Sequence, residues 1–405
     1  MIHQLPIPES EYSNQLQKMK AQAAQIQDFA EYSYLQTPWA KTNQLTEKVQ
    51  QFVEEWRAQL NESALSNSDR SIFFTLLGAV FNALPSYNEL STNFLTQAVR
   101  YDQQSFFAYL QLAISSTKAK NFRRAELMFE LAHRFATPPL LSQLLSYQSL
   151  LYRLYQNPSV EVLNKAVQLS REAVEQNPND ERAWFGLGMS LLKISSSENE
   201  LAKAGNSLRK AITIREQQKK PYPDARFNYG MLCRLRLDFQ QAYDQFKQAH
   251  VEDPSLTQAV VRYNELETLI SAAIGRISGR MLEIGVFQDP SKGLFGMVCG
   301  KNNFQVSFRI LSKFDSQLPQ FFIIQSIDEK QGKNQRCLFS SNLAVRELDV
   351  GAVVVLPEVF AKVIQLKTKG QSYQCVCVCF EGGQINVNGN DVQAAGKVVW
   401  QSELQ

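Results

Sequence analysis

The spacing of apolar residues changes near Gly279, and the two parts of the chain predict different secondary structure. Before this point, apolar residues recur every three or four positions with little Gly or Pro, which is typical of helices with one buried face. The segments 10–35 and 41–60 show this pattern most plainly. We therefore predict that residues 1–65 form an N-terminal helical or capping region.

Small residues at fixed offsets predict repeated helical hairpins further along the chain. Steps of twelve, four and three residues separate a small residue, an alanine, a phenylalanine and another alanine in two segments: Gly230, Ala242, Phe246 and Ala249, and Ala113, Ala125, Phe129 and Ala132. Partial copies surround Gly188 and Ala173. Small residues allow two helices to approach closely, and Pro178 and Pro254 would each end a second helix.

These copies favour an all-helical repeat array over residues 66–272. They recur about every 38–41 residues, and their spacing resembles that of tetratricopeptide repeats, whose usual period is about 34 residues. Several copies are therefore longer and less regular than that motif.

After Gly279, alternating and β-branched runs predict strands separated by turns, at 304–311, 320–327, 335–341, 352–368, 372–380 and 384–389. A short helix is predicted over 342–350, between the third and fourth runs. Five strands with a helix in that place are the layout of an oligonucleotide/oligosaccharide-binding (OB) barrel. The predicted fold class is thus α+β: a tetratricopeptide-repeat solenoid, a linker over 273–304 and an OB-fold β-barrel over 305–398.

Composition excludes few classes of function. The 405 residues are 44% hydrophobic and 20% charged, with a net charge of +3, so overall charge does not favour nucleic acid or an anionic membrane. No secretory signal and no run of 18 apolar residues is evident, so we expect no membrane segment and a cytoplasmic, or also nuclear, location. Reduced thiols are then expected at all six cysteines: Cys233, Cys299, Cys337, Cys375, Cys377 and Cys379.

No motif for catalysis is present, so the sequence predicts no enzyme, no catalytic residues and no cofactor. There is no Gly-x-Ser-x-Gly, no phosphate-binding glycine loop and no His-Glu-x-x-His, and only three histidines occur. Cys375, Cys377 and Cys379 share one face of a predicted strand. Structural zinc usually needs two-residue gaps and a second ligand pair, so we interpret them as apolar thiols inside the barrel and predict no metal site.

Three stretches carry a resemblance to a known family: 181–192 and 223–255 in the repeats, and "VGAVVVLPEVFAKVIQLKTKGQSYQCVCV" followed by "INVNG" near the C-terminus. They resemble the tetratricopeptide repeat protein 5 family, also called Strap, the stress-responsive activator of p300. The resemblance covers roughly residues 70–390.

This resemblance implies a monomeric adaptor that acts in tubulin autoregulation. Its repeat groove would recognise the N-terminal peptide of nascent tubulin at the ribosome, and a downstream adaptor would then promote decay of the tubulin mRNA. Two alternatives stay open. One is a stress-response scaffold that binds p300-type acetyltransferase complexes and an actin-nucleating partner; the other is an RNA-binding protein that acts through its OB fold.

The tubulin N-terminus begins Met-Arg-Glu, so its groove needs an acid and a base. By resemblance, Asp224 would accept the peptide's arginine or α-amino group, and Arg153 would bind its glutamate through two hydrogen bonds. Asn228, one helical turn beyond Asp224, would hold the peptide backbone, while Phe227 and Met231 would line the groove. The plainer interpretations are a helix cap for Asp224 and a solvated surface residue for Arg153.

The sequence departs from the family pattern at two places. Gln258 stands where the family has a second groove acid, and the family's lysine-rich linker is reduced here to Arg276 and Arg280. The candidates for ribosome or RNA contact are basic and aromatic residues, with an ordinary solvated hairpin tip as the alternative for the last four: Arg276, Arg280, Lys362, Lys367, Lys369 and Tyr373.

Overall fold

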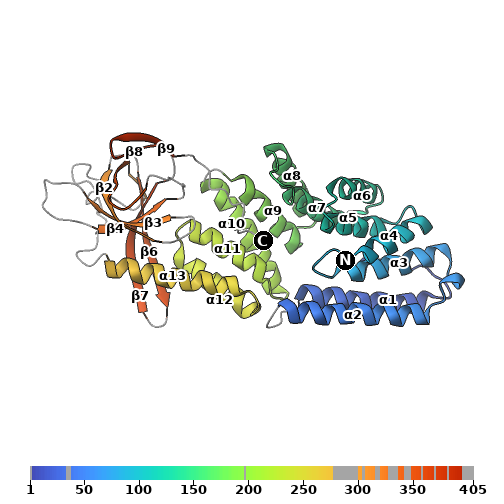
Figure 1. Cartoon of the computed structure of the whole chain (residues 1–405). Coiled ribbons are helices and arrows are strands. Elements are labelled where there is room, and N and C mark those ends of the chain that lie inside the picture. Colours follow the sequence, from blue (N-terminus) through green and yellow to red (C-terminus); the bar gives the residue numbers. More distant parts are fainter. Residues whose placement is uncertain are drawn as a thin grey trace. The chain divides into compact units, whose positions relative to one another are not determined.

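The structure is a computed structural model of the whole chain (Figure 1). It describes residues 2–32, 38–195, 198–276, 300–302, 306–314, 320–326, 336–341, 348–356, 359–368, 371–380 and 383–394. The chain forms two compact units. The first comprises Met1–Ser195, Asn199–Ala225 and Glu252–Ser255, and the second comprises Ser196–Glu198, Arg226–Val251 and Leu256–Gln405.

The first unit begins with two long helices, as the apolar spacing predicts. They are α1 (Ser13–Tyr32) and α2 (Pro38–Gln59), with the short 3-10 helices η1 (Ile2–Gln4) and η2 (Glu62–Ala64) beside them. Leu16, Met19 and Ala23 of α1 are fully buried in the same core as the repeats that follow. α1 contacts both α2 and α3, so the N-terminal helices are built onto the repeats.

The remaining helices form five antiparallel hairpins and one further helix (Figure 1). In chain order they are α3 (Asn67–Asn82) with α4 (Glu89–Tyr101), α5 (Phe106–Lys118) with α6 (Phe122–Arg134), α7 (Pro138–Arg153) with α8 (Val160–Gln176), α9 (Glu181–Ile194) with α10 (Glu198–Gln217), α11 (Pro223–Leu235) with α12 (Phe239–Glu252), and α13 (Thr257–Arg276). Among the described helices, none is long and apolar enough to cross a membrane.

Side-chain caps explain where several of these helices begin. Asn, Ser or Asp precedes the first turn, and its side-chain oxygen accepts a hydrogen bond from a backbone N–H of that turn, at Asn88, Ser105, Asn121, Ser159 and Asp180. Such caps satisfy N–H groups that have no partner within the helix.

Close approach of the two helices in each hairpin confirms the role of the small residues. A Cβ atom at Gly188 would lie 2.8 Å from Leu208 Cγ, and one at Gly230 would lie 2.8 Å from the ring of Phe246. In the third hairpin a serine takes this position: the Ser149 hydroxyl lies 2.9 Å from the Ala166 carbonyl oxygen, to which it donates a hydrogen bond. The repeats are therefore held at a short interhelical distance despite their irregular length.

Two glycines of α9 provide a matched test of this packing. Gly188→Ala should destabilise the protein by about 1–2 kcal/mol, because overpacking outweighs the gain in helix propensity. At Gly186 the nearest atom would be 3.6 Å from an added Cβ, so Gly186→Ala should stabilise by about 0.5–1 kcal/mol. Thermal unfolding of both variants measures the difference, and equal shifts would contradict close approach at Gly188.

The described residues of the second unit form one nine-stranded sheet. Its strands are β1 (Gly300–Asn302), β2 (Val306–Lys313), β3 (Gln320–Ser326), β4 (Arg336–Ser341), β5 (Val353–Leu356), β6 (Val359–Thr368), β7 (Gln371–Phe380), β8 (Gly383–Val387) and β9 (Asn390–Ala394). They are ordered β1-β6-β7-β4-β3-β2-β5-β8-β9. All neighbours are antiparallel except β4 and β7, which are parallel.

This sheet corrects the closed barrel expected from the sequence. The described ladder is open, with β1 and β9 at its two ends. The run 352–368 is two strands, β5 and β6, and these pair with different neighbours. A further hairpin, β8–β9, extends the edge through a turn at Asn388 and Gly389, both with positive φ. Most of the predicted helix over 342–350 lies outside the described residues, and 348–350 are not helical.

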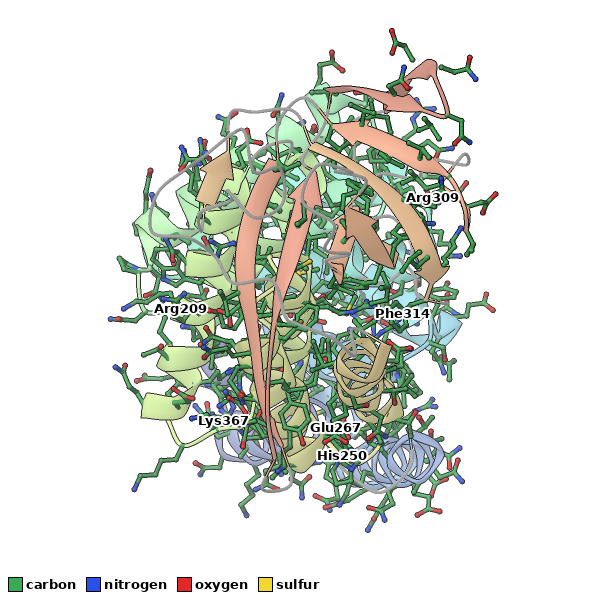
Figure 2. The ribbon with its side chains drawn as sticks, turned by 90° about the vertical axis from the view of Figure 1, so that its left-hand side faces the viewer. Arg209, His250, Glu267, Arg309, Phe314 and Lys367 are labelled. Atoms are coloured by element: carbon green, nitrogen blue, oxygen red, sulfur yellow. The ribbon has the colours of Figure 1, made fainter. Side chains whose placement is uncertain are left out.

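The last hairpin and the sheet pack together within the second unit. The ring of Phe239 on α12 meets Phe321 on β3 edge to face, with centroids 5.7 Å apart. The Lys367 backbone N–H donates to Gln240 Oε1 at 2.7 Å, near the end of the long β6–β7 hairpin (Figure 2). α13 contacts β6 and β7. The sheet therefore covers apolar surface of the last helices.

Candidate peptide-binding site

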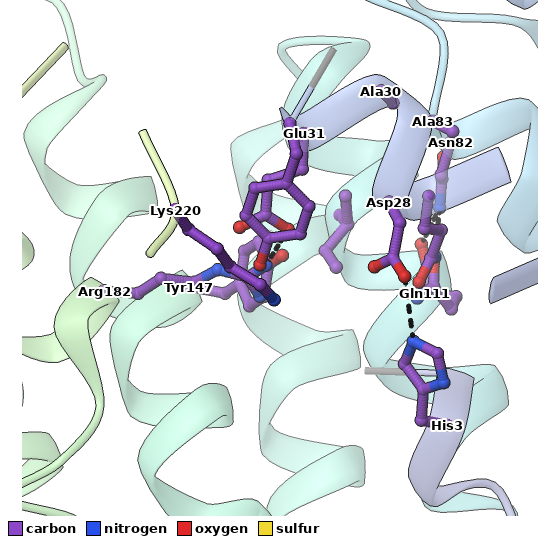
Figure 3. Close-up of a pocket in the computed structure, with 13 residues that line it drawn as sticks. His3, Asp28, Ala30, Glu31, Asn82, Ala83, Gln111, Tyr147, Arg182 and Lys220 are labelled. Atoms are coloured by element: carbon purple, nitrogen blue, oxygen red, sulfur yellow. Dashed lines mark hydrogen bonds and ion pairs between the residues drawn. The ribbon is translucent and has the colours of Figure 1, made fainter. Parts of the chain in front are cut away.

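A polar cavity of about 560 Å³ lies between the end of α1 and the first helices of the repeats, all within the first unit (Figure 3). The first helices of four successive hairpins and the segment after α10 supply one wall, through Asn82, Gln111, Ile114, Tyr147, Arg182 and Lys220. The N-terminal segment supplies the other wall, through His3, Gln27, Asp28, Ala30, Glu31 and Tyr32. Residues distant in sequence are thus gathered on one surface.

An ionic cluster closes one side of this cavity. The Glu31 carboxylate pairs with Arg182, and its Oε1 lies 2.7 Å from Arg215 Nη2. Arg215 Nε also lies 3.2 Å from Glu181 Oε1. The Arg215 side chain is only 3% exposed, so two carboxylates surround a nearly buried guanidinium. Burial alone would raise the pKa of Glu31, but the charges of Arg182 and Arg215 hold it below the usual value.

Local sequence explains how the cluster is positioned. Asp180 caps α9 by accepting hydrogen bonds from the Arg182 and Ala183 backbone N–H groups, and Ser142 donates a third to its carboxylate at 2.9 Å. This cap fixes the first turn of α9, which carries Glu181 and Arg182. The two residues therefore reach the cavity from a well-anchored helix end.

Tyrosines complete the cationic cluster. The Arg215 guanidinium lies 4.7 Å from the ring centroids of both Tyr32 and Tyr222, and the Lys220 ammonium lies 4.2 Å from that of Tyr32. Such contacts stabilise a cation over an aromatic face. Tyr222 also packs on Phe185, with centroids 5.4 Å apart, and its backbone N–H donates to Glu252.

Arg153, a residue predicted from the sequence, ends α7 beside this cluster. The guanidinium lies near Tyr222, and Nη2 would be 3.9 Å from a Cβ at Gly186. Its Nε is buried and has no hydrogen-bond partner in the described residues. Burial lowers the pKa of Arg153 to about 10. The pKa of the neighbouring Lys193 is lowered by burial and by the charge of Arg153. The Lys193 ammonium donates a hydrogen bond to the Arg153 carbonyl oxygen at 2.7 Å.

Asp224 lies in the first turn of α11, where its side chain still reaches solvent. Its pKa is raised because protein atoms crowd the carboxyl group and because Asp253 lies near, while Lys41 acts in the opposite direction. Tyr222 lies within electrostatic reach of both Asp224 and Arg153.

The other three predicted groove residues belong to the second unit and are buried. Phe227, Asn228 and Met231 are 4%, 1% and 5% exposed. Phe227 packs on Phe246, with ring centroids 5.6 Å apart, at the contact that Gly230 allows. Phe227 therefore contributes to packing within the hairpin, and Met231 is buried on the same helix.

The predicted ribosome and RNA contacts are placed only in part. The Lys367 side chain is exposed on β6, and the Lys367 backbone N–H donates a hydrogen bond to Gln240. Arg276 ends α13, Lys362 lies on β6 and Tyr373 on β7. Arg280 and Lys369 lie outside the described residues.

The three alternating cysteines of β7 are buried free thiols, as predicted. Burial raises the pKa of Cys375 to about 12. Over the described part of the chain, no group of His, Cys, Asp and Glu could hold a metal ion.

Sequence reasoning missed the Glu31–Arg182–Arg215 cluster and its tyrosines. Glu31 is 151 residues from Arg182 and 184 from Arg215, and no local motif marks this pairing. The only signal was indirect, since an apolar helix ahead of a repeat array must pack on that array.

Comparisons with known proteins agree with the repeat geometry. No family model matches the chain. Repeated hairpins with small residues at their contacts are typical of tetratricopeptide-repeat proteins. The chain is similar to human tetratricopeptide repeat protein 5, with 22% identity over 263 residues, which cover 64% of this chain and 60% of the relative. It is thus a tetratricopeptide-repeat protein related to that human protein, and the match spans about 60% of the relative's length.

Solved structures with similar folds are also tetratricopeptide-repeat proteins. YrrB, described as having an unusual peptide-binding site, is 21% identical with a TM-score of 0.35, over 48% of this chain and 90% of YrrB. A thermophilic protein of Thermus thermophilus is 23% identical with a TM-score of 0.40, over 49% of this chain and 98% of that protein.

The Glu31 cluster predicts a defined pH dependence. A carboxyl whose folded pKa is lowered stabilises the protein above its unfolded pKa, and this stabilisation is lost as pH falls through the folded value. Glu31→Gln should therefore destabilise by about 1–3 kcal/mol at pH 7 and by progressively less below about pH 4.5.

Thermal unfolding at pH 7 and pH 3.5 measures this effect. Asp28→Asn is the matched control on the same helix, because its contact with His3 is long, at 3.6 Å, and exposed. A pH-independent difference between wild type and Glu31→Gln would contradict a stabilising charge on Glu31.

Proposed function

We propose that this chain is a non-enzymatic adaptor that recognises the N-terminal peptide of nascent tubulin at the ribosome and promotes decay of the tubulin mRNA. The repeat fold and the relationship to tetratricopeptide repeat protein 5 support a protein-binding role. The tubulin ligand follows from the family resemblance of the sequence. Arg153 and Asp224 are the residues that would select it.

The state of Arg153 is the observation that carries this proposal. A guanidinium whose Nε is buried without an acceptor is unfavourable, and a carboxylate that accepts its hydrogen bonds would remove that penalty. The glutamate of Met-Arg-Glu provides such a carboxylate. Lys193 lies beside Arg153 and adds positive charge, so the site favours an acidic side chain.

Asp224 would receive the positive end of the same peptide. Its pKa is raised by burial and by the nearby Asp253, both of which destabilise the ionised form, so a bound cation would be favourable there. Tyr222 interacts electrostatically with both Arg153 and Asp224, so it would contact the peptide between the peptide's two charged residues. Opposite charges at two ends would fix the direction of the bound peptide.

Fluorescence anisotropy with labelled Met-Arg-Glu-Cys and Met-Arg-Glu-Ile peptides tests this proposal. Arg153→Gln and Asp224→Lys should each weaken binding by about 10- to 100-fold, as expected for the loss of a charge-assisted hydrogen bond. Arg171→Gln, at an exposed position of α8, is the matched control and should bind like wild type.

A peptide with Gln in place of Glu separates direct contact from indirect effects. If Arg153 binds that glutamate, the Glu-to-Gln peptide should bind wild type weakly and should lose little more in Arg153→Gln. Equal binding of a scrambled peptide to wild type would overturn the tubulin proposal.

For the C-terminal region we propose an OB-type fold that contacts the ribosome. β2, β3 and β4 form an antiparallel series, β4 then pairs in parallel with β7, and β7 pairs with β6. This connectivity corresponds to the strand order of a five-stranded OB fold, which is a partly open Greek-key barrel. The exposed Lys367 would contact ribosomal RNA through its phosphates.

Co-sedimentation with ribosomes tests this second contact. Lys367→Glu should reduce the bound fraction at low salt while leaving the affinity for the tubulin peptide unchanged, because the peptide residues Arg153 and Asp224 lie in the other unit. Ribosome binding that is insensitive to both Lys367→Glu and salt would exclude a phosphate contact at this position.

A further inference from the structure

The last two residues of α1 occupy a site made by the repeats. Glu31 pairs with Arg182 and Arg215, and Tyr32 lies under the cations of Arg215 and Lys220. Figure 3 shows Glu31, Lys220 and Arg182 meeting at one side of the cavity. An acidic residue followed by an aromatic one is therefore bound much as a peptide ligand would be.

The two ends of α1 are held in different ways. Leu16, Met19 and Ala23 are fully buried in the apolar core. From residue 27 onward every side chain of the helix except that of Phe29 lines the polar cavity, and all of them are partly or fully exposed. The last turn can therefore leave the repeats by breaking ionic and aromatic contacts and exposing the partly buried Phe29 and Ala30, while Leu16, Met19 and Ala23 stay in the core.

The charges of this last turn also oppose helix formation. Asp28 and Glu31 lie near the C-terminal end, where the helix dipole is negative, and no basic residue of α1 offsets them there. The turn is stabilised by cations of the repeats and not by its own sequence. An acidic ligand for those cations would therefore also release this turn.

We propose that Arg182, Arg215 and Lys220 form an exchangeable carboxylate-binding site that Glu31 fills in the free protein. An acidic peptide, with a carboxylate followed by an aromatic residue, takes this site by displacing the last turn of α1. The proposal extends the peptide-binding function above, because Tyr222 stacks on Arg215 and lies near Arg153. The N-terminal helix thus competes with the partner.

Glu181 makes the exchange favourable. Its carboxylate remains 3.2 Å from Arg215 Nε when Glu31 leaves, so one side of the buried guanidinium stays paired. The vacated side, Nη2, keeps its orientation for an incoming carboxylate. A preformed site needs less ordering on binding.

A labelled peptide with the sequence of residues 28–32, Asp-Phe-Ala-Glu-Tyr, tests the site directly in the full chain by anisotropy. Glu31→Gln should bind it at least tenfold more tightly than wild type, because the internal competitor is weakened. Asp28→Asn removes an unfavourable charge from the same helix end without touching the cations, so it should bind the peptide no more tightly than wild type. Adding Arg182→Gln to Glu31→Gln should abolish binding, as should replacing Glu by Gln in the peptide.

Tyr32→Ala is a second variant that loosens the last turn while keeping every charge, and it should also tighten peptide binding. Thermal unfolding identifies any variant that fails to fold. Equal affinity for wild type, Glu31→Gln and Tyr32→Ala, with all three folded, would overturn the proposal and make the Glu31 pair a permanent structural bridge.

The tubulin peptide is titrated in parallel to separate the two proposals. If Asp-Phe-Ala-Glu-Tyr binds the variants but the Met-Arg-Glu peptides bind none, the exchangeable site stands and the tubulin ligand is wrong. If the Met-Arg-Glu peptides bind wild type and Glu31→Gln equally, and the acidic peptide binds neither, the tubulin ligand stands and the exchange is wrong.

Discussion

The short distance between the two helices of each hairpin is the constraint on which the first unit depends. At Gly188 there is no room for even one additional carbon atom against Leu208, and Ser149 donates a hydrogen bond across the equivalent contact. Helices fixed at this distance stack with their first members side by side. That stacking brings Gln111, Tyr147 and Arg182, from three different hairpins, onto one cavity wall.

Charge then distinguishes two neighbouring parts of this surface. Arg215 is nearly buried but forms ion pairs with Glu31 and Glu181, whereas the described residues provide no ion pair for Arg153, whose buried Nε also has no hydrogen-bond acceptor among them. A buried charge is costly unless it is paired. The paired arginine explains how the last turn of α1 is held on the repeats. Under the proposed function, a ligand carboxylate would contribute most at the Arg153 Nε, which has no acceptor among the described residues.

Much of the fold could be predicted from the sequence because its signals are local. The twelve-four-three spacing locates hairpin contacts such as Gly230 with Phe246, and alternating apolar residues locate most strands. Strand order is not local, since hydrogen bonds between distant strands decide it. The open order, the division of 352–368 into β5 and β6, and the added β9 therefore differ from the expected barrel.

The candidate site was less predictable, for a related physical reason. Arg153 and Asp224 were predicted from a family resemblance. Spacing alone could not show whether Phe227 is buried within the hairpin or lines the groove, because residues of both kinds lie on a first helix. Glu31 could not be found at all, since its partners are more than 150 residues away. Long-range ion pairs leave no periodic trace in a sequence.

The second unit shows how the end of a repeat array can become a functional surface. A terminal hairpin exposes an apolar face that must be covered. Here the sheet covers it, through Phe321 against Phe239 and through the Lys367 backbone bonded to Gln240. The hydrogen bond between the Lys367 backbone and Gln240 also holds the end of the β6–β7 hairpin in place, and it leaves the Lys367 side chain exposed. A basic side chain on a rigid support and a peptide site in another part of one chain would together give avidity that neither provides alone.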